Sequence, residues 1–397
     1  MRIRSLKQIR NLKGKKILLR VDFNVPTGKK GKITDSARIE EALPTIKYLK
    51  SKKAKIIIIS HLGRPDGQLK KELKLDKIAK KLAQFLKSPV KKLDEILGKK
   101  VEAKITKMKN GEIVMLENIR FDAGEEKCEK SFTKALASLG EIFVNDAFGT
   151  AHRKHASTAG LADFLPAYAG FLMEKEIKTL SKILNEKPKR PLTMIFGGAK
   201  IDTKIGIIKQ FLKKADYFLI GGGLANTFLH AAGYNVGNSL YEKDKVEIAR
   251  EIMLSSEKNK ERFILPHDVI VSEEVSGNAK TLNLPIQDVM GNMRILDIGK
   301  WSIEKFNNII SKSKTIIWNG PVGLSEYKQF ANGTRQIAQA IAKSKCYSII
   351  GGGDTAEAIK RMKIKESKFT LVSTGGGACL EFLSGEKLPG IECLKIK

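Results

Sequence analysis

Short aliphatic segments in the N-terminal half of the chain end in polar and charged residues, as in RVDFNVP at Arg20 to Pro26. A polar group that is buried without a partner costs roughly 1–3 kcal/mol, so such residues either begin a loop or contact a ligand. The pattern occurs four times, which favours a ligand. The residues concerned are Asp22 and Asn24, His61 and Arg64, Arg120, and the group His152, Arg153 and His155.

Arginine and histidine dominate these segment ends. In an open parallel sheet the ligand binds beyond the carboxyl ends of the strands, so the side chains are expected to meet in one crevice. The planar guanidinium group binds phosphate or carboxylate through two hydrogen bonds. Arg38 begins the helical segment TDSARIEEALPTIKYL, where a cation opposes the helix dipole, and is expected to join them. The pattern predicts a cage for a small, multiply anionic molecule.

Glycines take the place of charged residues in the second half of the chain. Glycine lets a ligand approach the backbone closely, and free N–H groups at the start of a helix bind anions. One glycine pair is typical of a turn, but four strand–glycine–helix junctions predict a cradle for polyphosphate and hence a nucleotide site. The junctions are Gly197–Gly198, Gly221–Gly223, Gly351–Gly353 and Gly375–Gly377.

Common nucleotide-binding patterns fit these junctions only in part. The P-loop pattern GxxxxGK[ST] does not occur, which disfavours that class. Residues 351–356 match the relaxed GxGxxA pattern of dehydrogenases, but Ser373 and Thr374 stand where an acid should bind the ribose. Asp354 lies inside the phosphate loop, where a carboxylate would repel phosphate unless Mg²⁺ lay between them. A dehydrogenase therefore stays open as an interpretation with little support.

The two halves together predict a phosphotransferase built across a cleft. One half would hold a compact anion through arginines, and the other would hold polyphosphate through backbone amides. Lys200 and Lys204, in GGAKIDTK, lie beside the first glycine pair and could neutralise a phosphoryl group during transfer. Either lysine could equally be a surface cation.

Length and periodicity predict the architecture that positions these residues. Short aliphatic segments alternate with helical patterns, which is typical of α/β proteins with parallel sheets. With 397 residues the chain is long enough for about two domains. The longest aliphatic run, at 56–59, is too short to span a bilayer, which indicates a soluble, cytoplasmic protein. Four cysteines without metal-ligand spacing predict free thiols.

The net charge is strongly positive. Lys and Arg number 73 against 43 Asp and Glu, which leaves +30 and favours attraction to polyanions. The lysines are spread over the exposed faces of predicted helices, and aromatic residues make up only 7%. A basic nucleic-acid-binding protein on a kinase fold is therefore the alternative function, and a solvated basic surface is the simpler interpretation.

The order of motifs resembles that of the phosphoglycerate kinase family. The motifs are RVDFNVP, SHLGRP, LENIRF, NDAFGTAHRKHAS, FLMEKEI, GGAKIDTKI, WNGPVG, GGGDTAEA and STGGGACLEFL. The resemblance implies reversible phosphoryl transfer between 1,3-bisphosphoglycerate and ADP, giving 3-phosphoglycerate and ATP with Mg²⁺, in glycolysis and gluconeogenesis. It also implies a monomer of two doubly wound, Rossmann-like domains that face each other across a hinged cleft, with no membrane or specific nucleic-acid partner.

The resemblance also assigns roles to residues at the matching positions. Expected to bind 3-phosphoglycerate are Asp22, Phe23, Asn24, Arg38, His61, Leu62, Gly63, Arg64, Arg120 and Arg153. Expected to bind the nucleotide are Gly198, Ala199, Lys204, Gly222, Asn319, Glu326, Gly352, Gly353, Asp354 and Thr355, with Asp354 contacting Mg²⁺. Arg38, Lys200 and Gly376 are expected to act in catalysis.

Domain limits follow from the same motifs. The expected substrate domain spans 1–171, the connecting helix and linker 172–191, the nucleotide domain 192–379, and a segment returning to the first domain 380–397. Four places differ from the family pattern: Ser325 replaces phenylalanine, Lys300 proline, Cys379 serine, and Arg294-Ile295 a glycine near the base. The last difference is expected to alter the base pocket.

Overall fold

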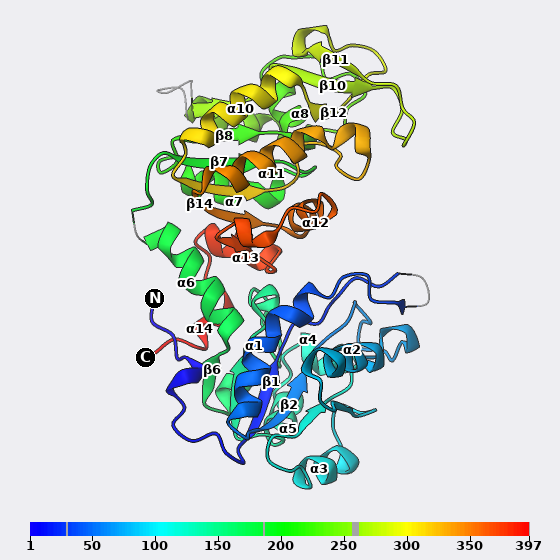
Figure 1. Ribbon diagram of the computed structural model, residues 1–397, viewed down its shortest axis with the longest axis vertical. Helices are drawn as coiled ribbons and strands as arrows, with labels where there is room; N and C mark the ends of the chain where they lie inside the picture. Colours follow the sequence, from blue (N-terminus) through cyan, green and yellow to red (C-terminus); the bar gives the residue numbers. More distant parts are fainter. Residues whose placement is uncertain (29–30, 186, 256–261, 397) are drawn as a thin grey trace. The chain divides into compact units, whose positions relative to one another are not determined.

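The computed structural model describes residues 1–28, 31–185, 187–255 and 262–396. The chain forms two compact units, shown in Figure 1. Unit 1 comprises Met1–Lys178 with Lys387–Lys397, and unit 2 comprises Thr179–Glu386. Each unit contains a six-stranded sheet whose strand pairs are all parallel. The predicted α/β fold is confirmed.

The first strand of unit 1, β1, lies in the interior of its sheet. The strand order is β3-β4-β2-β1-β5-β6, so the chain moves outward from β1 on one side and returns to β5 on the other. The gap beyond β1 and β5 is the topological switch point at which open α/β sheets bind ligands. The strands are β1 (Lys16–Arg20), β2 (Lys55–Ile59), β3 (Lys91–Lys92), β4 (Ile113–Met115), β5 (Ile142–Asn145) and β6 (Ala167–Ala169).

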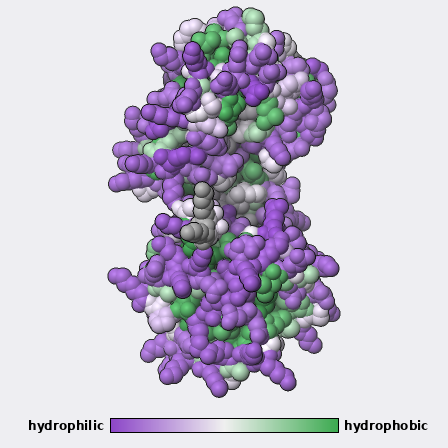
Figure 2. All heavy atoms as spheres, turned by 90° about the vertical axis from the view of Figure 1, so that its right-hand side faces the viewer, coloured by the Kyte–Doolittle hydropathy of each residue, from purple (hydrophilic) through white to green (hydrophobic). Residues whose placement is uncertain are grey.

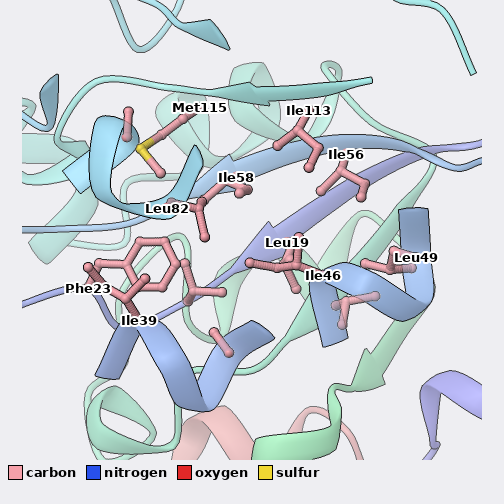
Figure 3. Close-up of a cluster of buried hydrophobic side chains, with 14 of the residues drawn as sticks. Leu19, Phe23, Ile39, Ile46, Leu49, Ile56, Ile58, Leu82, Ile113 and Met115 are labelled. Carbon is pink, nitrogen blue, oxygen red and sulfur yellow. The ribbon is translucent and has the colours of Figure 1, made fainter. Parts of the chain in front are cut away.

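Aliphatic side chains from the sheet and two helices form the core of unit 1. Leu19, Ile56 and Ile58 on β1 and β2 pack with Ile46 on α1 and Leu82 on α2 (Figure 3). Each fully buried side chain of this size contributes about 1.5–3 kcal/mol, which fixes the strand ends relative to one another. The helices of unit 1 are α1 (Ala37–Ser51), α2 (Asp76–Leu86), α3 (Lys99–Thr106), α4 (Ala123–Glu126), α5 (Lys130–Ala137), the first part of α6 (Phe171–Asn185), and α14 (Pro389–Glu392).

The first strand of unit 2, β7, also lies in the interior of its sheet. Its strand order is β15-β14-β13-β7-β8-β9, with the switch point between β7 and β13. The strands are β7 (Leu192–Phe196), β8 (Tyr217–Ile220), β9 (Phe263–Ile264), β13 (Thr315–Asn319), β14 (Tyr347–Gly351) and β15 (Leu371–Val372). The helices after the linker are α7 (Asp202–Phe211), α8 (Gly222–Ala231), α9 (Val246–Ser255), α10 (Lys300–Lys312), α11 (Asn332–Ser344), α12 (Gly353–Arg361) and α13 (Gly377–Leu383).

Unit 2 also contains a small antiparallel sheet that the sequence analysis did not predict. Its order is β11-β10-β12, from Leu282–Pro285, Asp268–Ser272 and Arg294–Ile298. The strand pattern is weak because β11 is largely exposed and carries little apolar alternation. The sheet supplies one wall of the cavity described below.

The C-terminal segment packs against unit 1. The backbone N–H of Arg4 donates to the carbonyl of Leu394 at 2.8 Å, and that of Gly390 donates to Ala151 at 2.8 Å. Compared with the expected limits, the division between the units lies within α6, inside the expected connector. The returning segment begins at Lys387 rather than at 380, because α13 packs on α7 in unit 2.

The surface in Figure 2 is mostly hydrophilic, with hydrophobic residues gathered in small patches. Among the described residues, no helix is both long enough and apolar enough to cross a membrane. The cysteines Cys128, Cys346, Cys379 and Cys393 are free thiols, as predicted.

Candidate active site

The structure brings the predicted cationic residues of unit 1 together. The buried ring of His61 lies in the field of four guanidinium groups, which together with burial lower its pKa well below the usual value. The four groups come from β1, α1, the 3₁₀ helix η4 (Ile119–Phe121) and the loop after β5. We call the following residues the arginine cage: Arg38, Arg120, Arg153, His61, His152 and His155.

Several buried nitrogen atoms of the arginine cage have no hydrogen-bond partner within the part of the chain that the structure describes. Arg120 is buried; its Nη1 donates to the carbonyl of Gly63 at 2.9 Å, and its Nε lies 3.1 Å from Glu126 Oε1. Its Nη2 has no hydrogen-bond partner, and neither do the buried Nδ1 atoms of His152 and His155. Leaving a buried donor unpaired costs about 1–3 kcal/mol. An anionic ligand at this site would satisfy these atoms.

Arginine, and not histidine, supplies the positive charge of the cage. Burial and the neighbouring arginines lower the pKa of His155 to about 4, and the same causes lower the pKa of His152. The imidazoles are therefore neutral at neutral pH and act as hydrogen-bond donors or acceptors. Burial also lowers the pKa of Arg120 to about 10, which leaves its guanidinium charged at that pH.

The remaining predicted substrate residues surround the cage in different ways. Asp22 Oδ2 accepts from Arg38 Nη1 at 2.6 Å, and Asn24 Oδ1 accepts from the N–H of Gly63 at 2.8 Å. The first bond joins the loop after β1 to α1, and the second joins it to the loop after β2. Phe23 and Leu62 are buried and belong to the core, whereas Arg64 is exposed.

Unit 2 contains a cavity of about 670 Å³ beside its switch point. Of the predicted nucleotide-binding residues, the cavity is lined by Gly198, Ala199, Gly222, Glu326 and Asp354. These residues come from the ends of β7 and β8, the loop after β13 and the start of α12. The volume suits a nucleotide-sized ligand.

Residues of the small antiparallel sheet complete the cavity wall. Arg294 and Ile295, which the sequence analysis placed near the nucleotide base, line the cavity. Asp297 also lines it and was not predicted. Its carboxylate accepts from the N–H of Gly333 at 2.8 Å at the start of α11, and burial raises its pKa to about 7. Its bond to Gly333 joins residues 36 positions apart in sequence, so no local pattern signals it.

The cavity lining does not include every residue that was predicted to bind the nucleotide. Lys204 is buried, and its Nζ donates to the carbonyl of Lys200 at 3.0 Å. Burial lowers the pKa of Lys204, while Asp354 and Glu242 act to raise it. Lys200 itself is exposed. Thr355 Oγ1 accepts from the N–H of Gly320 at 2.7 Å, which joins α12 to the loop after β13.

The predicted glycine junctions serve two different purposes. A Cβ at Gly197 would overlap the carbonyl oxygen of Pro321, and a Cβ at Gly320 would overlap that of Gly197. Gly320 also has a positive φ of 91°, which glycine adopts at no steric cost. In contrast, a Cβ at Gly353 would meet nothing within 4 Å. The junction after β7 is therefore built for loop packing, and that at α12 is open to a ligand.

This difference predicts opposite effects of two alanine substitutions. Gly320→Ala should lower the free energy of unfolding by about 3–4 kcal/mol, because the backbone clash and the positive φ add together. Gly353→Ala, the matched control at an open site, should change it by less than about 1 kcal/mol. Denaturant titration of both variants checks the expectation, and equal losses would contradict it.

An anion cage at one switch point and a nucleotide-sized cavity at another define a phosphotransferase. The family model "Phosphoglycerate kinase" matches residues 6–386. A curated phosphoglycerate kinase from Dictyoglomus turgidum is 53% identical over 388 residues, covering 98% of this chain and 97% of that protein. The chain therefore belongs to the phosphoglycerate kinase family and is an enzyme of the kinase class that acts in glycolysis.

Solved structures agree with this assignment. The phosphoglycerate kinase of Coxiella burnetii has a TM-score of 0.86 at 40% identity and covers 99% of both chains. That of Pyrococcus horikoshii has a TM-score of 0.86 at 34% identity, covering 99% of this chain and 98% of the other. Neither the nucleic-acid-binding alternative nor the dehydrogenase interpretation finds support in these comparisons.

Proposed function

We propose that the chain transfers a phosphoryl group reversibly between 1,3-bisphosphoglycerate and ADP, giving 3-phosphoglycerate and ATP. Family membership supports the reaction. The observation that carries the proposal for unit 1 is the buried Nη2 of Arg120, which has no hydrogen-bond partner among the described residues. Such a donor suits a small phosphorylated acid, because each phosphate oxygen accepts charge-assisted hydrogen bonds.

Polar and charged residues in and around the arginine cage receive proposed roles on this basis. Arg120 and Arg153, with His61 and Arg64, bind the 3-phosphate. Asp22 and Asn24 hold the hydroxyl and carboxyl end of the glycerate. Arg38 reaches the reacting carboxylate, and its hydrogen bond to Asp22 at 2.6 Å supports a fixed orientation.

The nucleotide is proposed to occupy the cavity of unit 2. Glu326 binds the ribose, and the amides at the start of α12, Gly352 to Thr355, contact the phosphates. Asp354 acts to raise the pKa of Lys204, and we propose that both side chains act on the same phosphates. The other proposed nucleotide contacts, from the loops after β7, β8 and β13, are Gly198, Ala199, Gly222 and Asn319.

The residues present fit a magnesium ion carried by the nucleotide. Mg²⁺ is typically held by one or two carboxylates together with substrate phosphates. Asp354 is an exposed carboxylate in the first turn of α12 that lines the cavity. Within the described ranges, no group of three or more potential metal ligands occurs. We propose that Asp354 holds the ion, which would neutralise phosphate charge during transfer.

The proposed mechanism depends on positioning and charge. The acceptor is a carboxylate that is already ionised, so no base is needed to remove a proton. Lys200 and the N–H of Gly376, at the start of α13, are proposed to stabilise the charge on the phosphoryl group in the transition state. Arg38 would hold the attacking carboxylate in line.

We also propose that the protein is a cytoplasmic monomer whose two units close when both substrates bind. Unit 1 supplies the proposed glycerate contacts and unit 2 the nucleotide contacts, so transfer requires the two ligands to meet. Small-angle scattering should give a monomer mass and a radius of gyration that falls only when 3-phosphoglycerate and MgATP are both present. An unchanged radius in an active preparation would contradict closure.

The function itself is tested by a coupled assay. The purified protein should form 1,3-bisphosphoglycerate from 3-phosphoglycerate and MgATP, which glyceraldehyde-3-phosphate dehydrogenase reduces with oxidation of NADH. Omission of Mg²⁺ should abolish the loss of NADH. A protein that binds both substrates without turnover would contradict the proposed reaction.

A further inference from the structure

A buried chain of hydrogen bonds lies directly behind the arginine cage. Glu125, on α4, is 0% exposed, and its two carboxylate oxygens accept from Ser157: Oε1 from the hydroxyl at 2.6 Å and Oε2 from the backbone N–H at 2.9 Å. The same hydroxyl oxygen accepts from Arg20 Nε at 2.8 Å. Ser157 thus joins a buried carboxylate to a buried guanidinium group.

Arg20 carries this chain to His61. The Arg20 side chain is also 0% exposed, and its Nη2 lies 3.2 Å from His61 Nδ1. A guanidinium group can only donate, so Nδ1 is the acceptor. The proton of the neutral imidazole then lies on Nε2, which leaves an N–H donor for a ligand.

The buried charge of the Arg20 guanidinium group explains why this chain of hydrogen bonds includes a carboxylate. Burial lowers the pKa of Arg20, while Glu125 and Asp22 act to raise it. Without Glu125, Arg20 would lose one of the two carboxylates that act on it, and a buried charge without compensation is costly. None of the three residues is among those expected to bind 3-phosphoglycerate.

We propose that Glu125, Ser157 and Arg20 form a support chain that positions His61, with its proton on Nε2, for binding of phosphoglycerate. The proposal rests on the proposed function of the cage, since it assigns His61 a ligand. In this account Arg20 is a positioning residue, and Glu125 and Ser157 hold it in place. Through the support chain, binding of phosphoglycerate would depend on Ser157 and Glu125, which lie outside the arginine cage.

Ser157→Ala is the direct test, because it removes the bridging hydroxyl and little else. The KM for 3-phosphoglycerate should rise about tenfold, which corresponds to about 1.4 kcal/mol, whereas the KM for ATP should stay within about twofold. Nitrogen-15 NMR of labelled histidine should show His61 protonated on Nε2 in the natural protein and a mixture of tautomers in the variant. Ser157→Thr, which keeps a hydroxyl, should recover the natural tautomer.

Unit 2 provides a matched control with the same local arrangement. The buried Ser302 donates to Asp268 Oδ1 through its hydroxyl at 2.7 Å and through its N–H at 2.8 Å. Ser302→Ala should therefore lower thermal stability about as much as Ser157→Ala does, and it should leave the KM for 3-phosphoglycerate unchanged. If Ser157→Ala does not fold, Glu125→Gln, which preserves side-chain shape, replaces it and should give the same tautomer change and KM selectivity.

Two outcomes would overturn the support chain. One is an unchanged His61 tautomer together with an unchanged KM for 3-phosphoglycerate in the variant. The other is an equal rise in both KM values, which would indicate general damage to the fold. If the natural protein instead shows no activity in the coupled assay, the proposed function fails, while the NMR comparison still decides whether the chain sets the tautomer.

Discussion

Replacing Lys200 by methionine should lower kcat by about 10²–10³-fold, roughly 3–4 kcal/mol at 1.36 kcal/mol per decade. Lys200 is exposed at the end of the loop after β7, beside Gly198 in the cavity wall. We expect its ammonium to meet the phosphoryl group only near the transition state, when charge is spread over three oxygens. Binding made only there lowers the barrier without improving ground-state affinity. Both KM values should therefore change little.

Lys209→Met is the matched control, since Lys209 is an exposed lysine on the helix that follows, α7. It should leave kcat within about twofold of the natural value, and neither substitution should change thermal stability appreciably. Steady-state kinetics on both variants checks the expectation. If Lys200→Met keeps more than about a tenth of kcat, less than about 1.4 kcal/mol is involved, and Lys200 is a surface cation.

Replacing Arg153 by alanine should raise the KM for 3-phosphoglycerate by about 10–100-fold. A charge-assisted hydrogen bond contributes about 1.5–3 kcal/mol, and each 1.4 kcal/mol is about tenfold in affinity. Arg153 Nε lies 3.3 Å from His152 Nε2. Within the described residues no carboxylate forms an ion pair with Arg153, so removing its side chain breaks no salt bridge.

The neighbouring residue Lys154 is the control for Arg153, because it is exposed on the same loop. Lys154→Ala should leave the KM for 3-phosphoglycerate within about twofold, and Arg153→Ala should leave the KM for ATP equally unaffected. Isothermal titration with each ligand separates these contributions. A comparable loss of 3-phosphoglycerate and ATP binding in Arg153→Ala would place Arg153 outside the phosphate site.

The arginine cage could be predicted from sequence because most of its residues lie in the segments that follow strands of one sheet, and Arg38 lies on the helix after β1. Parallel strands end at the same edge of a sheet, so Arg120 and Arg153 converge although they are distant in the chain. The repeated motif order predicted the two α/β units in the same way. Here the local sequence pattern and the sheet topology both predict that these side chains lie close together.

The support chain could not be predicted, because its members signal nothing locally. Ser157 is one small polar residue in a loop, and Glu125 looks like an ordinary helix surface residue in GEEK. Their importance depends on burial and on Arg20, which lies 137 residues before Ser157 in the chain. The bond between Asp297 and Gly333 and the packing of Gly197 against Pro321 could not be predicted for the same reason, since each joins residues distant in sequence.

The backbone bonds from Arg4 to Leu394 and from Gly390 to Ala151 also determine the order in which the molecule can be completed during translation. Residues 387–396 leave the ribosome only after all of unit 2 has been made. Until then, nascent unit 1 lacks the segment that packs beside the loop carrying Arg153, whereas unit 2 is synthesised as one continuous segment. The half of the enzyme that is synthesised first is the half that is finished last.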